Sequence, residues 1–470
     1  MKKNRNNKNH EIAVVAYLFA FLFVGLIGYF VYFMVIDSQN VINNPYNKRQ
    51  ELLAERVIRG EIQASDGTVL AENKTNSKGE EYRSYPYDAI FCHAVGRADK
   101  GKTGVELSQN IRLLTSHENP LTAFFKELKG EKNIGDNVVT TLDVSLQKVA
   151  YQALGSRKGA IVVMEPDTGK ILAMVSKPDY NPNKVASNWE YLVEDSENNS
   201  ALLNRATQGL YPPGSTFKTL VAIEYIRENG GVKYSYTCDG SDTFEDVKIN
   251  CYGNKKHGEE DLKKSFAKSC NASFANIGMG LDVKAFKSLC ESFLFNKKLP
   301  VDFAYNQSSF VLNSSSSKSE IPQTMIGQGD TQITPLHNAM IAAAIANDGK
   351  MMKPYMVDRI ESYTGNVVKQ YQPVLIGEPI TKAEAKKLQN MMRAVVEEGT
   401  ATALNTGSYT AAGKTGSAEF DSTKASHSWF IGYAKTKKKQ LAVSIIVEGA
   451  GTGSEYAVPI ARKIFDSYLK

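Results

Sequence analysis

Ser215 and Lys218, a serine and a lysine three positions apart, are the residues of this chain whose types and spacing most directly allow chemistry. They follow a Pro-Pro-Gly break at 212–214 and precede an apolar segment at 220–226, which predicts that both lie at the start of a buried helix. Residues three apart share one helix face, so the lysine amine can reach the serine hydroxyl. A serine alcohol needs a base to become a nucleophile, and a lysine of lowered pKa can be that base. Alone, this pair is a weak signal and far more often marks an ordinary helix start.

Two further short motifs follow in the sequence, Ser269-Cys-Asn271 and Lys414-Thr-Gly416. Each has an ordinary structural explanation, since Ser and Asn are good helix caps and Lys-Thr-Gly can end a strand. The order Ser-x-x-Lys, Ser-x-Asn, Lys-Thr-Gly is, however, the order of motifs in serine acyltransferases that react with β-lactams. The three motifs together therefore predict acyl transfer through a serine.

Acylation of Ser215 requires proton removal, proton delivery to the departing amine, and donors for the oxyanion. We expect Lys218 to be the base and Ser269 to carry the proton to the leaving nitrogen. Asn271 is expected to hydrogen-bond the substrate amide and to orient Lys218. Lys414 supplies a positive charge that lowers the pKa of Lys218 and attracts a carboxylate.

The strand expected around Lys-Thr-Gly supplies the substrate-binding groups. Thr415 can hydrogen-bond the substrate carboxylate, and Gly416 is expected to leave the strand edge open to the substrate. The backbone N–H groups of Ser215 and Ser417 are the expected oxyanion donors.

Residues 12–36 carry no charge and are long enough to span a bilayer. Four basic residues precede them, and Asp37 follows. The positive-inside rule therefore predicts a cytoplasmic tail at 1–11 and places everything after Asp37 outside the bacterial cell membrane. The alternative is a cleaved signal peptide, whose apolar region would be shorter and would end in a small-x-small site.

Five cysteines occur, at 92, 238, 251, 270 and 290. Outside the membrane Cys238 and Cys251 can form a disulfide, and free buried thiols are the equal alternative. No Cys-x-x-Cys is present and the six histidines are scattered singly, so we expect no metal and no cofactor. No basic run or nucleic-acid-binding motif occurs in the expected folded part, which excludes a nucleic-acid partner.

The expected elements favour one α/β (α+β) domain over residues 138–470. A helix is expected at 144–154, a hairpin at 160–175, a strand at 441–447 and a closing helix at 459–469; strands at both ends predict a central antiparallel sheet with helices around it. Thr334-Pro335 opens an apolar helix, and a capping box at Thr381 opens another that runs to 398. Residues 37–137 read as a small mixed module, with a hairpin at 59–71 and helices at 48–57 and 104–114.

The chain resembles class B penicillin-binding proteins, the monofunctional D,D-transpeptidases of peptidoglycan synthesis, in a subgroup with a short N-terminal module. Besides the three motifs, the likeness includes 59–62, Gly327-Gln-Gly329 and 427–433. In that family the latter two are a loop beside the active site and the strand next to the catalytic edge. The N-terminal module is a pedestal, and the penicillin-binding transpeptidase domain follows it.

The resemblance implies acylation of Ser215 by stem peptides ending in D-Ala-D-Ala, transfer to a neighbouring strand, and covalent inhibition by β-lactams. It also implies a SEDS-type glycan polymerase as membrane partner. The alternatives are a D,D-carboxypeptidase, a serine β-lactamase and a non-catalytic cell-wall scaffold. A β-lactamase needs a residue that activates water, and no Glu-x-x-Leu-Asn lies between 271 and 414.

Overall fold

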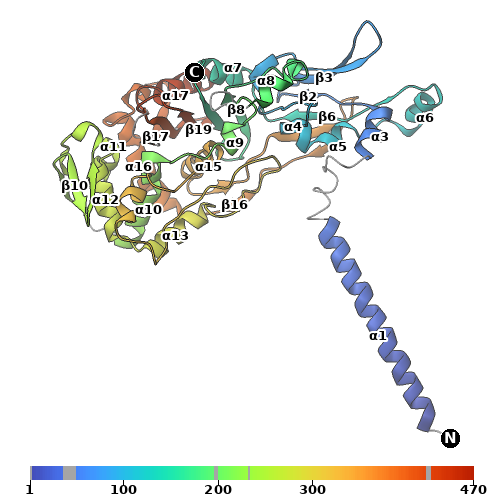
Figure 1. Cartoon of the computed structure of the whole chain (residues 1–470), viewed down its shortest axis with the longest axis horizontal. Helices are drawn as coiled ribbons and strands as arrows, with labels where there is room; N and C mark the ends of the chain where they lie inside the picture. Colours follow the sequence, from blue (N-terminus) through green and yellow to red (C-terminus); the bar gives the residue numbers. More distant parts are fainter. Residues whose placement is uncertain (1–2, 35–48, 195–199, 231–232, 420–424) are drawn as a thin grey trace.

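The computed structural model describes residues 3–34, 49–194, 200–230, 233–419 and 425–470. Helix α1 (Lys3–Tyr32) is the long helix at the N-terminus, and Figure 1 shows it standing apart from the folded body. Its segment His10–Tyr32 is long and apolar enough to cross a membrane, and none of its hydrophobic window is buried. The span expected at 12–36 is matched as far as Tyr32, where α1 ends; residues 35–36 and Asp37 lie outside the described residues.

A five-stranded antiparallel sheet forms the centre of the main domain. Its strands run in the order β17 (Thr410–Ala418), β18 (His427–Lys435), β19 (Gln440–Val447), β7 (Gly159–Met164), β8 (Ile171–Lys177). The strands are rich in Val and Ile and almost wholly buried, because helices cover the sheet. Helices α7 (Val144–Leu154) and α17 (Ala457–Leu469) pack together against it, and α15 (Pro335–Ala346) packs on it separately (Figure 1).

The predicted closure of one sheet by both ends of the domain is confirmed, since β19 pairs with β7. Helix α15 is buried at every residue, as its unbroken apolar sequence predicts. Helix α16 (Lys382–Glu397) begins at the expected capping box, in which the Thr381 side chain accepts from the Glu384 backbone N–H and the Glu384 carboxylate accepts from that of Thr381.

A second sheet joins the N-terminal module to the main domain. Its strand order is β15 (Val367–Gln370), β14 (Val357–Glu361), β6 (Asn137–Thr140), β2 (Ile62–Gln63), β3 (Val69–Thr75), β4 (Glu81–Ser84). The β2–β3 hairpin turns at Asp66-Gly67 as predicted, with Gly67 at φ +86°. The predicted domain boundary at residue 138 falls inside this sheet, because β6 pairs with β2 on one side and with β14 on the other.

The rest of the N-terminal module is built from short elements: α3 (Arg49–Arg56), β1 (Val57–Ile58), η2 (Asp88–Phe91), α4 (Gly104–Ser108), α5 (Asn110–Leu113), α6 (Pro120–Leu128) and β5 (Asn133–Ile134). The single helix expected at 104–114 is two helices, interrupted at Gln109. The fully buried Glu106 of α4 accepts hydrogen bonds from Arg59 and Arg83, so one carboxylate ties three segments of the module together.

Six elements form a helical lobe beside β17: η4 (Gly214–Phe217), α10 (Lys218–Asn229), α11 (Leu262–Lys268), α12 (Asn271–Gly280), α13 (Val283–Ser292) and α14 (Glu320–Met325). Helix α9 (Arg205–Gln208) packs on α15, β7 and β8. Phe217 packs on the rings of Phe286, Phe295 and Phe310 in the core of the lobe. Four short strands form two hairpin-like pairs at the edge of the lobe, β9 (Tyr236–Cys238) with β12 (Gly258–Glu260) and β10 (Ser241–Phe244) with β11 (Val247–Asn250).

Smaller elements complete the described chain. They are η3 (Pro182–Lys184), α8 (Trp189–Val193), η5 (Tyr252–Asn254), β13 (Met351–Met352), β16 (Leu375–Gly377) and η6 (Thr402–Leu404).

Candidate active site

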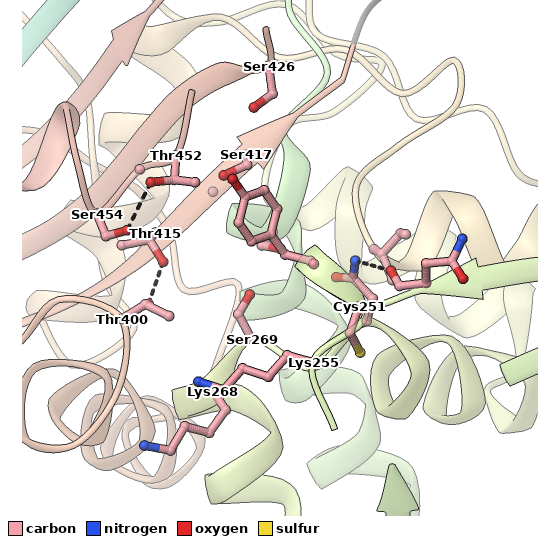
Figure 2. Close-up of a pocket in the computed structure, with 18 of the residues that line it drawn as sticks. Cys251, Lys255, Lys268, Ser269, Thr400, Thr415, Ser417, Ser426, Thr452 and Ser454 are labelled. Carbon is pink, nitrogen blue, oxygen red and sulfur yellow. Dashed lines mark hydrogen bonds between the residues drawn. The ribbon is translucent and has the colours of Figure 1, made fainter. Parts of the chain in front are cut away.

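A cavity of about 550 Å³ opens between β17 and the helical lobe. Its walls include at least one residue of each of the three sequence motifs: Ser215, Ser269 and Asn271, and Thr415, Gly416 and Ser417. Figure 2 shows Ser269 facing Thr415 and Ser417 across this space. Segments separated by up to two hundred residues in sequence are therefore brought to one cavity.

Ser215 lies in the 3-10 turn η4, immediately before α10. The prediction that it begins the helix needs a small correction, because α10 itself starts at Lys218. Two contacts fix this turn: the Gly214 N–H donates to the Gly327 carbonyl at 2.9 Å, and the Trp429 indole donates to the Pro212 carbonyl at 3.1 Å. The turn thus holds Ser215 at the mouth of the cavity, half-buried.

Two lysines meet at Ser269. Lys218 Nζ donates to the Ser269 carbonyl at 2.8 Å and to Asn271 Oδ1 at 2.7 Å, and it lies 3.4 Å from Ser269 Oγ. Lys414 Nζ donates to Ser269 Oγ at 2.8 Å. The four residues therefore form one hydrogen-bonded network, as the sequence analysis expected for Lys218, Ser269, Asn271 and Lys414.

Ser215 is not hydrogen-bonded to Lys218 among the described residues, although the prediction put the two within reach. The Lys218 amine is instead held by the Ser269–Asn271 segment. Catalytic hydrogen bonds are often long in a site without substrate and shorten when substrate is bound. The network therefore holds the Lys218 amine near the turn that carries Ser215, without a hydrogen bond to the Ser215 hydroxyl.

Both lysine side chains are completely buried. Burial lowers the pKa of Lys218 to about 8, against a smaller opposite effect from the nearby Cys270, Cys251 and Glu260. Burial, and then the charge of Lys218, lowers the pKa of Lys414 well below its ordinary value. The two amines thus disfavour each other's protonation, so one of them can be neutral near physiological pH.

The backbone around Ser269 is shaped for this role. Ser269 ends α11 in the left-handed conformation with φ +60°, and the Cys270 side chain caps α12 by accepting from the Ser273 N–H. Left-handed geometry at a non-glycine residue is uncommon and persists where its surroundings hold it. This turn aims the Ser269 hydroxyl at Lys414 and the Asn271 amide at Lys218.

Strand β17 forms the opposite wall and lies at the edge of the central sheet. Thr415 Oγ1 is 2.5 Å from Thr400 Oγ1, and Figure 2 marks this contact. A Cβ on Gly416 would lie 3.0 Å from Trp429 Cβ and 3.1 Å from Thr216 Cγ2. Gly416 therefore packs tightly against β18 and the η4 turn. It also lines the cavity, and its expected role of leaving the strand edge open to substrate stays a prediction.

Several residues at the site carried no chemical signal in the sequence. Trp429 donates to the turn that carries Ser215, Thr400 contacts Thr415, and Gln328 lines the cavity. Trp429 and Gln328 lie in two of the segments that carried the family resemblance, which was the signal that could have identified them. Thr400 lies between α16 and β17 and had no such signal.

The cysteines differ from one of the two alternatives. The Sγ atoms of Cys238 and Cys251 are 3.7 Å apart and not bonded, so the disulfide that was one expected possibility is not formed. The other alternative, free buried thiols, is the one that the structure has. The argument against a metal site relied on linear spacing, and the fold overturns that reasoning. It brings His257 and three cysteines, Cys238, Cys251 and Cys270, within 4.8 Å of one another.

Comparisons with known proteins agree with this geometry. The sequence matches the penicillin binding protein transpeptidase domain over residues 159–466, well over half of the chain. The chain belongs to the penicillin-binding protein transpeptidase family. A curated relative, the peptidoglycan D,D-transpeptidase PbpA of Mycolicibacterium smegmatis, is 29% identical over 98% of this chain and 99% of its own.

Solved structures of penicillin-binding protein A from M. tuberculosis are similar over nearly their whole length. The penicillin G acyl-enzyme superposes with a TM-score of 0.79 at 28% identity, covering 88% of this chain and 99% of that one. The imipenem acyl-enzyme gives 0.80 at 27%, covering 88% and 100%. The predicted family, class B penicillin-binding proteins, and the predicted transpeptidase fold are confirmed.

Proposed function

We propose that this penicillin-binding protein is a membrane-anchored D,D-transpeptidase that cross-links peptidoglycan stem peptides through an acyl-enzyme on Ser215. The observation that carries this proposal is the network in which Lys218, Ser269, Asn271 and Lys414 meet beside the Ser215 turn. The relatives that share the fold include peptidoglycan D,D-transpeptidases and β-lactam acyl-enzymes. These findings support the same reaction here.

In the proposed acylation, Ser215 Oγ attacks the carbonyl carbon of the penultimate D-Ala and its proton passes to the neutral amine of Lys218. The bond to the terminal D-Ala nitrogen breaks, and Ser269 relays a proton to this leaving amine. An amine of a neighbouring stem peptide then attacks the ester carbonyl and gives a proton to the network, the ester C–O bond breaks, and the network returns a proton to Ser215 Oγ. Each step returns the protons it takes, so the site needs no other reactant.

The oxyanion donors are proposed to be the backbone N–H groups of Ser215 and Ser417. Their proximity is supported by Gly214, where an added Cβ would lie 2.9 Å from the Ser417 carbonyl oxygen. Turn η4 and strand β17 therefore approach each other closely at the cavity. Donors fixed in this way stabilise the charge that develops on the carbonyl oxygen.

Substrate is proposed to lie along the free edge of β17, with its carboxylate near Thr415. Lys414 has its pKa lowered by burial and by Lys218, and a bound carboxylate would favour its protonated form again. Bound substrate would thus keep Lys414 protonated, and the positive charge of Lys414 would favour the neutral form of Lys218. This division gives each lysine one role, charge for Lys414 and base for Lys218.

The test is intact-protein mass spectrometry of the full chain in detergent with penicillin G, followed from seconds to hours. We expect one adduct that persists in the wild type and in Ser315→Ala, a serine in an exposed loop, and that is absent from Ser215→Ala. An adduct that clears within seconds would indicate a β-lactamase instead. Absence of an adduct from folded wild-type protein would leave a scaffold role.

We also propose the orientation that the charges around α1 predict, with the tail at 1–11 in the cytoplasm and residues after 37 outside. Protease added to spheroplasts should then digest the catalytic domain, and protection would contradict the orientation. The anchor and residues 37–137 are proposed to contact a SEDS-type polymerase. We expect the polymerase to stop co-purifying when residues 12–36 are replaced by an unrelated membrane span. Undiminished co-purification after both the anchor and residues 37–137 are replaced would refute this contact.

A further inference from the structure

A cluster of metal-ligating atoms lies next to the active site and has no part in the acyl transfer described above. It consists of the sulfurs of Cys238, Cys251 and Cys270 and the Nδ1 atom of His257, all within 4.8 Å of one another. The four residues come from the end of β9, the residue after β11, the residue before β12 and the cap of α12. We propose that they form a structural Zn²⁺ site that holds the Ser269–Asn271 turn in place.

Three of the six distances between these atoms are close to those of a coordination tetrahedron, and the other three are at most 4.8 Å. Cys238 Sγ to Cys251 Sγ is 3.7 Å, Cys251 Sγ to Cys270 Sγ is 3.7 Å, and Cys238 Sγ to His257 Nδ1 is 3.5 Å. Tetrahedral Zn²⁺ with ordinary Zn–S and Zn–N bonds separates its ligands by about 3.8 Å for S···S and about 3.6 Å for S···N. A disulfide would require about 2.05 Å. The arrangement therefore fits an ion at the centre and does not fit a covalent bond.

The ligand set also selects the metal. Three thiolates and one imidazole in a closed, four-coordinate site are typical of structural zinc, whereas magnesium and calcium take oxygen ligands. Loading would release a proton from each of the three thiols, leaving Zn(Cys)₃His with one net negative charge. No electron is transferred, so the site forms without an oxidant or a reductant.

The surroundings of the sulfurs suit thiolates. The Gly240 N–H donates to Cys238 Sγ and the Ser273 N–H donates to Cys270 Sγ, each at 3.4 Å. Backbone donors of this kind orient and stabilise ligating sulfurs. The three cysteines are buried, while Cys251 and His257 also line the active-site cavity. An ion can therefore enter from the cavity.

Strands β10 and β11 bury Phe244 and Ile249 in the main core, whereas the segment around the four ligands is separate from that core. The cysteines form a separate buried cluster, whose other buried member is Ala272 and whose partly buried neighbour is Tyr236. Small segments that cannot bury enough apolar surface are commonly stabilised by a metal. The ion would thus serve as the centre of the small cluster formed by the three cysteines and Ala272.

The site connects directly to catalysis, and this part rests on the proposed function. Cys270 stands between Ser269 and Asn271, so a metal bond to its sulfur fixes the turn that presents both side chains. Asn271 Nδ2 also donates to the carbonyl of Asn250, the residue before the ligand Cys251. The four ligands are therefore positioning residues for the network of two lysines.

The first test is the zinc content of the full-length chain, purified in detergent without chelator, incubated with ZnSO₄ and desalted. We expect one zinc per chain in the wild type and in the control Cys290→Ala, whose buried cysteine lies in the core of α13. Cys238→Ala should hold almost none. Replacement by Co²⁺ should give the thiolate-to-metal charge-transfer and tetrahedral absorption bands. A wild-type chain without stoichiometric zinc, or Cys238→Ala with as much zinc as wild type, would overturn the site.

A second measurement keeps the test valid if Cys238→Ala does not fold. Wild-type protein is treated with a zinc chelator, and penicillin acylation and the melting temperature are measured before and after ZnSO₄ is returned. We expect chelation to slow acylation by about tenfold or more and zinc to restore it. Unchanged acylation in verified metal-free protein would refute the positioning role. Zinc bound by a chain that never acylates would instead refute the proposed function and leave the metal site standing.

Discussion

The pH dependence of acylation follows from the burial of Lys218. Its side chain is fully buried, and burial lowers its pKa from 10.5 to about 8. The base must be unprotonated to accept the Ser215 proton, so the acylation rate should rise with pH and level off above the pKa. With a pKa near 8, the neutral fraction is about 9% at pH 7, about half at pH 8 and about 90% at pH 9.

The second-order rate constant for a chromogenic cephalosporin, measured by stopped flow with the full chain, should therefore increase about fivefold from pH 7 to pH 8 and about twofold from pH 8 to pH 9. A lysine with an ordinary pKa would give about tenfold per pH unit throughout this range. Lys218→Arg, which keeps the charge but cannot lose its proton, should acylate at least about 100-fold more slowly at every pH.

Two results would refute this reasoning. A profile that is flat from pH 6.5 to 9.5 would mean that no group titrating near 8 controls the attack. A slope of tenfold per unit with no plateau by pH 9.5 would mean that the base keeps an ordinary lysine pKa in spite of its burial. The charged groups that face Lys218, namely Lys414, Cys270, Cys251 and Glu260, set the exact midpoint.

Three other substitutions test the scaffold around the site. Gly416→Ala should slow acylation by about 10- to 100-fold, because the added methyl group presses on the strand and the turn that align Ser215. The control Gly407→Ala, whose added Cβ has nothing within 4 Å, should leave the acylation rate unchanged. Equal acylation rates for the two variants would contradict the packing argument. Asn271→Ala removes the 2.7 Å bond to Lys218, so acylation should fall while penicillin still reacts with the serine, and a wild-type rate would show that the bond does not orient the amine. Glu106→Ala leaves two buried guanidinium groups without their carboxylate, which should lower the free energy of unfolding of the N-terminal module by about 3–5 kcal/mol in a urea titration; an unshifted titration curve would exclude that cost.

The elements that the sequence predicted well are those decided by local patterns. The apolar strands β7 and β19, the helix α7 between turn signals, and the capping box at Thr381 all appear where expected. The three catalytic motifs were found by type and spacing, and the structure brings them to one cavity. Local signals were sufficient because each of these features is determined within about a dozen residues.

What could not be predicted depends on contacts between distant segments. Thr400 reaches Thr415, and the Trp429 indole reaches Pro212, through pairings that no local pattern encodes. The scattered cysteines gave no metal-ligand spacing, because two strand pairs fold back before α12 brings Cys270 to them. The close packing of Gly416 against the neighbouring strand and the η4 turn was likewise not visible in the sequence.

The six-stranded sheet that combines β2, β3 and β4 with β6, β14 and β15 has a consequence for how such proteins can be recombined. Its strands come from both sides of residue 138, so the N-terminal module is not a detachable cassette. A chain shortened to start at 138 would lose β2, one of the two partners of β6, and would leave that edge of β6 unpaired. A module grafted from a relative would have to match the register of β6 and β14, or bring its own copies of both. The N-terminal module and the catalytic domain therefore have to be exchanged together, because they share the backbone hydrogen bonds of one sheet.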